Sequence, residues 1–190
     1  ALDIAGCGRE AVDEAIAAMD PAPVAPGKYD IILRSDAMAS ILGAFAGMFS
    51  ADAAQKGLSP LAGREGEDMA AECVTLMDDP LYPINPSPFD DEGTPSVAKA
   101  VIKDGKLETL LHNLKTAKKA GVKSTSNGGR SSAGSPVGVR ITNFYIAPKE
   151  GTLGQLISEL GDGLLITDFS GLHAGVNPVS GKLSELCKGR

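Results

Sequence analysis

The sequence is poor in aromatic residues and contains no tryptophan. Aromatic residues make up 4% of the 190 residues, whereas 43% of the residues are hydrophobic. The core must therefore be built mainly from Ala, Val, Ile, Leu and Met. A chain of this length buries enough surface to support one domain. We expect a single domain over residues 1–190.

Cysteines are also few, and they lie far apart in the sequence. The chain has three of them, Cys7, Cys73 and Cys187, and no Cys-x-x-Cys motif. An odd number at this spacing is not typical of a disulfide framework or of a structural zinc site. We therefore expect a reducing compartment, and hence a cytoplasmic protein.

An excess of positive charge and long apolar runs are absent as well. Lys and Arg number 18 against 24 Asp and Glu, so the formal net charge is −6, which repels phosphate backbones. The most apolar stretch, residues 37–49, is shorter than the ~20 residues needed to span a bilayer. The chain also opens without the basic segment of a signal peptide. We expect neither nucleic acid nor membrane as a partner.

The pattern of apolar residues predicts helices and strands that do not alternate regularly. Helices are expected over 9–19, 35–49, 51–57, 114–120 and 153–160, and strands over 29–33, 73–77, 97–103, 106–111, 137–147 and 163–168. Ser35, Asn113 and Thr152 are candidate N-caps. Asp104-Gly105 predicts a type I′ hairpin, because both central positions need a positive φ. We predict an α+β fold with a mixed, largely antiparallel β-sheet and flanking helices.

Five carboxylates lie close together in the sequence. Asp78 and Asp79 end a predicted strand, and Asp90, Asp91 and Glu92 follow in the proline-rich loop 80–96. Such acids repel one another unless a cation, a basic group or water lies among them, which suggests a site for Ca²⁺ or Mg²⁺. Their spacing does not fit the calcium-loop pattern. We therefore predict that the five are mainly structural and accept hydrogen bonds from backbone amides, as in turns.

A second polar segment covers residues 123–132 and is rich in hydroxyls and glycine. It has neither the spacing of a Walker loop nor that of a G-x-S-x-G elbow. Its amides and hydroxyls could contact a peptide or an anion, and the alternative is a flexible loop tip. Candidate substrate-binding residues are Ser124, Thr125, Asn127 and Arg130.

The two histidines, His112 and His173, specify no catalytic site. No H-E-x-x-H pattern is present, and tetrahedral zinc needs several ligands held together. His112 is expected to lie on the surface or to have its hydrogen bonds satisfied, and His173 to lie in a loop. We predict no catalytic residue and no metal ligand.

Several motifs occur in a fixed order along the chain, among them Asp78-Asp79-Pro80, Asp91-Glu92-Gly93 and Ser124-Thr125. With Gly27-Lys28-Tyr29 before them and Asn177-Pro178-Val179-Ser180-Gly181 after them, the chain resembles the C-terminal domain of the TldD/PmbA (TldE) family, once called modulators of DNA gyrase. The resemblance implies that residues 1–190 form one truncated domain of this type. It also implies that the family's N-terminal domain is absent from the chain.

Zinc-bearing members of this family resemble one another in a His-Glu-x-x-x-His helix after the strand that matches residues 29–33. The same place here holds residues 41–49, Ile-Leu-Gly-Ala-Phe-Ala-Gly-Met-Phe, none of which can ligate zinc. The resemblance therefore implies the PmbA/TldE branch, with no metal or cofactor of its own. Its expected partners are a zinc-bearing TldD-type subunit, or a second copy of itself, and unfolded peptides.

These expectations combine into one predicted function. The chain would be a non-catalytic, peptide-binding subunit of a metallopeptidase complex, and an extended peptide could add as a strand at a sheet edge. Two alternatives remain open. One is a self-sufficient hydrolase whose acidic loops hold a metal, and the other is a purely structural domain that dimerises.

Overall fold

The computed structural model describes residues 3–17, 19, 22–184 and 186–189. Its helices are α1 (Ile4–Ala17), α2 (Ser35–Phe45), the 3₁₀ helix η1 (Ala46–Phe49), α3 (Ala51–Gln55), α4 (Leu114–Ala120), α5 (Leu153–Leu160) and α6 (Leu172–Gly175). Its strands are β1 (Ile31–Leu33), β2 (Leu76–Asp78), β3 (Lys99–Lys103), β4 (Lys106–Leu107), β5 (Gly128–Gly129), β6 (Gly138–Val139), β7 (Phe144–Ile146), β8 (Leu164–Ser170), β9 (Val176–Asn177), β10 (Lys182–Leu183) and β11 (Leu186–Gly189).

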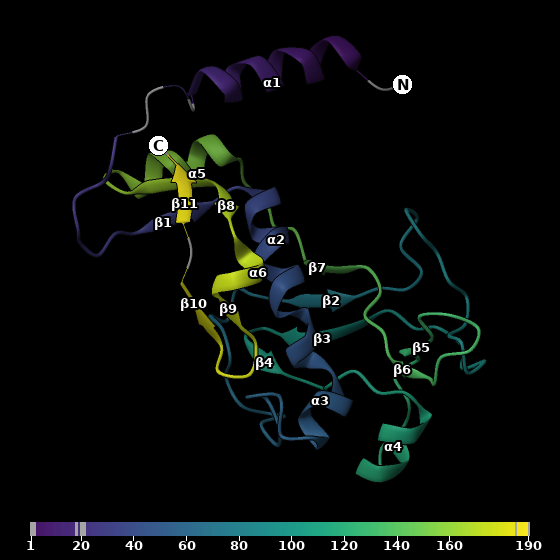
Figure 1. The fold of residues 1–190 in the computed structure, drawn as a ribbon. Helices are drawn as coiled ribbons and strands as arrows, with labels where there is room; N and C mark the ends of the chain where they lie inside the picture. The colour runs from purple at the N-terminus through teal and green to yellow at the C-terminus, as the bar shows by residue number, and fades with distance from the viewer. Residues whose placement is uncertain (1–2, 18, 20–21, 185, 190) are drawn as a thin grey trace.

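Two sheets form the framework, and each has its own strand order (Figure 1). The central sheet has the order β4-β3-β2-β7, and all of its neighbouring strands are antiparallel. The second sheet has the order β1-β8-β11, with β1 parallel and β11 antiparallel to β8. The strands β5 and β6, and β9 and β10, form two short ribbons. The predicted α+β fold with a largely antiparallel sheet is confirmed.

The main core lies where α2, η1 and α3 cross the central sheet (Figure 1). Its buried members come from η1, α3, the central strands and the segments that follow them: Phe49, Ala51, Leu61, Leu76, Val101, Ile102, Leu107, Leu110 and Leu111. The rings of Phe49 and Phe144 meet edge to face, with centroids 5.3 Å apart. Aliphatic side chains thus supply most of this core.

The predicted N-cap Ser35 and the predicted helix as far as Phe49 are both wrong. Ser35 is the first residue of α2, and Arg34 stands at the N-cap without a side-chain capping bond. The helix ends at Phe45 and tightens into η1, which brings Phe49 into the core with 7% of its surface exposed. Ser50 then caps α3 by accepting a hydrogen bond from the backbone of Ala53 at 3.4 Å.

The predicted long strand 137–147 is also wrong, because it is broken between β6 and β7. At the break, the backbone N–H of Thr142 donates to the carboxylate of Asp78 rather than to a neighbouring strand. Other predicted strands are shorter or displaced: 73–77 becomes β2 at 76–78, and 106–111 keeps only 106–107 as β4. The first helix begins earlier than predicted, and residue 18 lies outside the described residues.

Two of the three predicted N-caps and the predicted hairpin turn are confirmed. Asn113 and Thr152 each form a capping box at the start of α4 and α5. Gly121 ends α4 in the left-handed conformation at φ 70°. Asp104 and Gly105 have φ of 47° and 81°, as the predicted type I′ hairpin between β3 and β4 requires.

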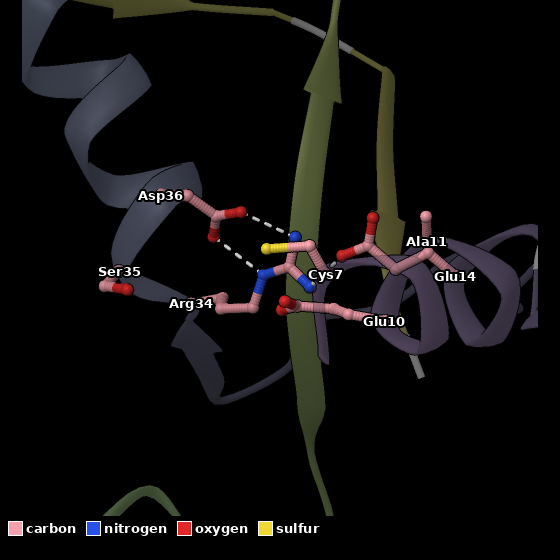
Figure 2. Close-up of a pocket in the computed structure, with 7 residues that line it drawn as sticks. All are labelled: Cys7, Glu10, Ala11, Glu14, Arg34, Ser35 and Asp36. Atoms are coloured by element: carbon pink, nitrogen blue, oxygen red, sulfur yellow. Dashed lines mark hydrogen bonds and ion pairs between the residues drawn. The ribbon is translucent and has the colours of Figure 1, made fainter. Parts of the chain in front are cut away.

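The helix α1 stands apart from the two sheets (Figure 1). An ion pair connects it to the rest through Arg34, which donates to Glu14 at 2.6 Å and to Asp36 at 2.7 Å (Figure 2). These carboxylates raise the pKa of the Arg34 guanidinium, Asp36 more than Glu14. None of the helices in the described part of the chain is both long and apolar enough to cross a membrane.

The β3–β4 hairpin requires glycine at position 105, and this requirement can be tested. A Cβ at Gly105 would lie 2.5 Å from the backbone oxygen of Ala70, in addition to the strain of a positive φ. Gly57 also has a positive φ of 72°, but nothing lies within 4 Å of its Cβ position. We expect Gly57→Ala to lower the free energy of unfolding by about 1 kcal/mol. Gly105→Ala should cost at least about 1 kcal/mol more.

Urea unfolding of the two variants, followed by circular dichroism, measures both changes. Equal losses for the two variants would mean that the backbone of residue 70 moves aside without cost. The difference between the variants isolates the steric contact, because both share the conformational strain.

Candidate functional site

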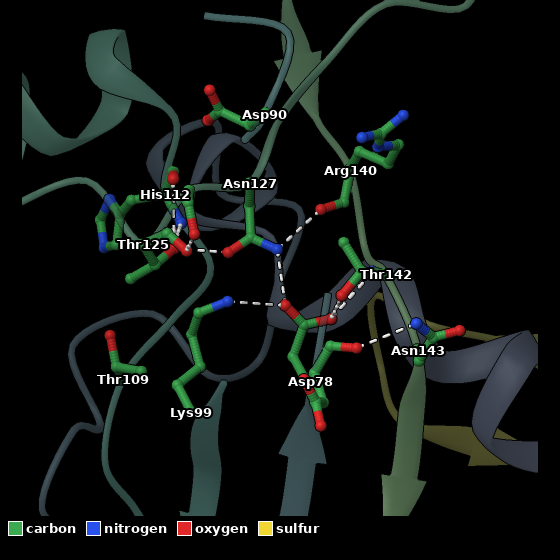
Figure 3. Close-up of polar contacts among 12 residues, drawn as sticks. Asp78, Asp90, Lys99, Thr109, His112, Thr125, Asn127, Arg140, Thr142 and Asn143 are labelled. Carbon is green, nitrogen blue, oxygen red and sulfur yellow. Dashed lines mark hydrogen bonds and ion pairs between the residues drawn. The ribbon is translucent and has the colours of Figure 1, made fainter. Parts of the chain in front are cut away.

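A buried carboxylate at the end of β2 connects segments that are far apart in the sequence (Figure 3). Asp78 is 0% exposed. Its Oδ1 accepts from the backbone N–H and the hydroxyl of Thr142, both at 2.8 Å. Its Oδ2 accepts from Lys99 Nζ at 2.9 Å and from Asn127 Nδ2 at 2.8 Å. Lys99 compensates the buried charge, and four donors satisfy the two oxygens.

Asn127 extends this network away from the carboxylate. Its side chain is 1% exposed, and its Nδ2 also donates to the carbonyl of Arg140 at 2.8 Å. Its Oδ1 accepts from the hydroxyl of Thr125 at 2.7 Å. Both amide hydrogens and the amide oxygen are therefore used within the protein.

The loop that carries Asp90, Asp91 and Glu92, called the acidic loop below, is held against β5 by Asp90. This residue is 3% exposed. One of its oxygens accepts from the backbone of Glu92 at 3.0 Å and of Thr94 at 2.8 Å, which closes the turn. The other accepts from the backbone of Gly128 at 2.8 Å. One carboxylate thus shapes the loop and attaches it to the neighbouring strand.

The remaining acids also accept backbone N–H groups. Asp91 accepts from Arg130 at 2.8 Å, and Glu92 accepts from the first residue of α4 at 2.7 Å. Asp79 accepts from the N–H two residues further along the chain at 2.9 Å. In the described ranges, no three His, Cys, Asp or Glu side chains lie together in a way that could hold a metal ion.

The four candidate substrate-binding residues differ in how far their side chains are buried. The hydroxyls of Ser124 and Thr125 approach the carbonyl of His112 at 3.2 and 3.1 Å, and both side chains are half-buried. Asn127 is buried in the Asp78 network. Arg130 has an exposed side chain, which donates to the carbonyl of Ser135 at 2.8 Å.

The polar segment 123–132 is not an exposed loop tip throughout, because part of it is buried and paired as a strand. Residues 126–129 are buried, and β5 pairs with β6. A Cβ at Gly128 would lie 2.7 Å from Glu92 Cγ, and one at Gly129 would overlap Arg140. The two glycines are therefore required for close approach between backbone and side chains.

His112 is neither a surface residue nor fully hydrogen-bonded, which corrects the sequence interpretation. It is 5% exposed, and its Nδ1 has no hydrogen-bond partner among the described residues. Burial lowers the pKa of its imidazole, while the backbone of Thr116 and the charge of Glu65 oppose this to a smaller extent. The Ser124 hydroxyl donates to the backbone carbonyl of His112 and the Thr125 hydroxyl to the amide oxygen of Asn127, so neither hydroxyl is hydrogen-bonded to the imidazole as an activated nucleophile would be. The side chain of His173 lies outside the described part.

Lys99 and Thr142 are members of the network that the sequence interpretation missed. A signal was present for the lysine. In strands, residues two apart share a face, and Lys99 lies two residues before the buried Val101, as Asp78 lies two after the buried Leu76. The two strands pair with Asp78 directly opposite Lys99. A charged residue in phase with buried residues on each of two neighbouring strands indicates a buried ion pair.

Residues 26–190 match the family described as PmbA/TldA metallopeptidase C-terminal domain. A solved structure of a putative modulator of a DNA gyrase from Thermotoga maritima is 38% identical, with a TM-score of 0.91. That similarity covers 99% of this chain and 43% of the Thermotoga protein. TldE from Thermococcus kodakarensis is 29% identical with a TM-score of 0.81, covering 90% of this chain and 39% of that one.

Curated relatives give the same result at the level of sequence. A metalloprotease of Archaeoglobus fulgidus is 35% identical over 139 residues, which is 73% of this chain and 32% of that protein. A metalloprotease PmbA homolog of Haemophilus influenzae is 26% identical over 185 residues, or 96% of this chain and 38% of that protein. The chain thus spans between 32% and 38% of the length of these two relatives.

The contacts of Asp78 and Asp79 lead to a test of their structural role. Asp78→Ala leaves the Lys99 ammonium and the Asn127 amide without their buried acceptor. We expect the free energy of unfolding to fall by about 3 kcal/mol or more. Asp79→Ala removes one hydrogen bond at a half-buried position and should cost about 1 kcal/mol.

Chemical denaturation of the two neighbouring variants gives both values under the same conditions. A similar small loss for both would contradict a structural role for Asp78. The same comparison extends to Asp90→Ala. If it left stability unchanged and abolished activity in a reconstituted complex, a functional role for the acidic loop would replace the structural one.

The burial of His112 predicts a pH dependence of stability. Its pKa in the folded state lies below the reference value of about 6.5, so the unfolded state binds more protons between the two values. Stability is therefore lost as the pH falls below about 6.5. NMR titration should place the His112 midpoint below that of a free imidazole, and His112→Gln should weaken the pH dependence. A midpoint at or above the reference value would contradict the buried, neutral imidazole.

Proposed function

Because the chain belongs to the PmbA/TldD metallopeptidase family, whose C-terminal domain it matches over residues 26–190, we propose that it is a non-catalytic, peptide-binding subunit of a cytoplasmic TldD/TldE-type peptidase complex. The observation that carries this proposal is that residues 37–49, in α2 and η1, have no side chain that could bind zinc. The carboxylate contacts, an edge strand and an exposed arginine support it further.

The segment 37–49 contains no His, Cys, Asp or Glu. In the zinc-bearing branch of the family that the chain resembles, the corresponding helix carries the metal ligands. Here Phe49 is buried in the core and Leu42 packs against it. Tetrahedral zinc needs three or four N, S or O ligands. The residues present do not fit a zinc ion, so we assign no step of peptide hydrolysis to this chain and expect the metal to come from a partner.

The carboxylate contacts weigh against a self-sufficient hydrolase. Asp78 and Asp90 direct all four of their oxygens to donors within the protein. A hard cation would have to displace those donors and leave the Lys99 ammonium beside it. The acidic loops are better suited to holding β2, β5 and α4 together.

An extended peptide has an edge strand available on the central sheet. The two edges are β4 and β7. Residue Lys106 of β4 already bridges to Asp68, whereas no described strand pairs with the outer side of β7. Ile146 of β7 is 37% exposed, and the rings of Tyr145 and Tyr82 meet at an angle of 52° with centroids 5.4 Å apart. Backbone pairing at such an edge accepts many sequences, which suits a subunit that binds unfolded peptides.

Arg130 is the second proposed contact. Unlike the other three candidate residues, it keeps an exposed side chain, and its guanidinium could donate to peptide carbonyls or a carboxylate. Its backbone is held by Asp91, so its position depends on the acidic loop. A variant at this position removes the contact without disturbing the buried network.

Purification and metal analysis test the subunit role. We expect the chain to hold far less than one equivalent of zinc, and to purify from its source together with a protein that carries the His-Glu-x-x-x-His motif. The reconstituted pair should cleave unfolded peptides, and the isolated chain should not. A full equivalent of zinc that survives mild chelation, together with cleavage by the chain alone, would establish the self-sufficient hydrolase instead.

A variant pair tests peptide binding in the same complex. Arg130→Ala should raise the KM for an unfolded peptide several-fold while leaving kcat and thermal stability nearly unchanged. Arg64→Ala is the matched control, because Arg64 is also exposed and, within the described ranges, its side chain pairs with the nearby Glu67 alone. Equal kinetics for the two variants would remove Arg130 from the peptide site.

A further inference from the structure

The helix α1 turns its polar side toward the rest of the domain and its apolar side away from it. Glu10 and Glu14 line a cleft of about 470 Å³ together with Arg34 and Asp36 (Figure 2). Cys7 and Ala11 line the same cleft. Val12 and Ile16 lie on the side away from the cleft and are 57% and 62% exposed, and Ile4, at the start of the helix, is 77% exposed. This is the reverse of the usual arrangement, in which the apolar side of an amphipathic helix faces the core.

The spacing of the apolar residues makes this side one continuous surface. Ile4, Gly8, Val12 and Ile16 follow one another at intervals of four residues, with Ala5 and Ala15 beside them. No residue of α1 is buried. The helix has 14 residues, and a helix of ~12–15 residues is marginal in water without tertiary packing. Something must therefore pack on its apolar side for α1 to persist.

The contacts that α1 makes in this structure are too weak for that purpose. The Arg34–Glu14 ion pair is solvent-exposed, and such a pair contributes about 0–1 kcal/mol. The connection that follows contains Pro23 and Pro26, which favour an extended chain rather than a continuation of the helix. The ion pair can orient α1, but it cannot supply the burial that the helix lacks.

The comparisons indicate what covers the helix. The family match begins at residue 26 and is described as a C-terminal domain, so α1 lies outside it. The Thermotoga protein aligns over 99% of this chain, which leaves at most two residues unmatched and therefore takes in α1. This chain is 43% of that protein, so most of that protein lies outside the aligned part.

We propose that the apolar side of α1 is the docking surface for a domain of the kind that precedes the C-terminal domain in the longer family members. Ile4, Val12 and Ile16 then belong to the core of that preceding domain. Arg34 becomes the joint between the two domains, because it holds Glu14 of α1 and Asp36 at the start of α2 at the same time. This inference does not depend on the proposed function.

Hydrogen exchange of two polypeptides tests the proposal. The first is the 190-residue chain, and the second is the same chain joined to the part of the Thermotoga protein that precedes the aligned region. We expect the amides of α1 to exchange rapidly in the first and at least about tenfold more slowly in the second. The amides of β2 and β3 report in both whether the C-terminal domain is folded.

Two variants of the joined protein separate packing from other effects. Ile16→Asp places a charge on the apolar side and should abolish the protection of α1. Glu10→Gln changes the opposite side and should leave it intact. Protection that survives Ile16→Asp would overturn the proposal, as would equal exchange of α1 in the two polypeptides.

Two further measurements test the other possible results: light scattering of the 190-residue chain, and hydrogen exchange of the Thermotoga protein. If the 190-residue chain is a dimer with α1 already protected, a second copy occupies the surface and the proposal is wrong. If the joined protein does not fold, full-length Thermotoga protein is compared with a version that begins where this chain aligns. Loss of protection in the helix aligned with α1 would support the proposal, and unchanged protection would overturn it.

Discussion

The ion pair between Asp78 and Lys99 is the interaction on which the rest of the central region depends. Burying a lone carboxylate costs several kcal/mol, and a single partner seldom offsets that cost. Here Oδ2 meets the Lys99 ammonium at 2.9 Å, and the amide of Asn127 and two groups of Thr142 supply the other donors. Since every donor is needed, β2, β3 and the segments around residues 127 and 142 must come into place together.

This requirement explains why the glycine-rich segment is ordered where it meets the network. Asn127 is held by Asp78 and Arg140, and the next residue, Gly128, donates its N–H to Asp90. The acidic loop can approach this closely only because Gly128 has no side chain. Carboxylates that resemble a metal site in the sequence therefore act as acceptors for backbone amides. The exposed side chain of Arg130 and the edge of β7, where we propose that a peptide binds, both lie outside this network.

The two helices at the start of the chain, α1 and α2, direct their apolar residues to different places. In α2 and η1, residues 37–49 contain no His, Cys, Asp or Glu, and Leu42 and Phe49 join the core. The catalytic metal of our proposal must then come from another chain. In α1, the apolar side points away from the domain to which its polar side is attached by Arg34. Both helices suggest a domain that works as one part of a larger assembly.

The sequence by itself determined the features that depend on neighbouring residues: the capping boxes of Asn113 and Thr152, the positive φ of Asp104 and Gly105, and the ordered motifs that indicated the family. Tertiary structure alone decided the break between β6 and β7, the burial of Asn127 and His112, and the end of α2 before Phe49. Asp78 and Thr142 are 64 residues apart, so no local pattern could show that a carboxylate interrupts the predicted strand. Caps and turns are set by local hydrogen bonds and backbone sterics, whereas burial is set by which distant segments meet.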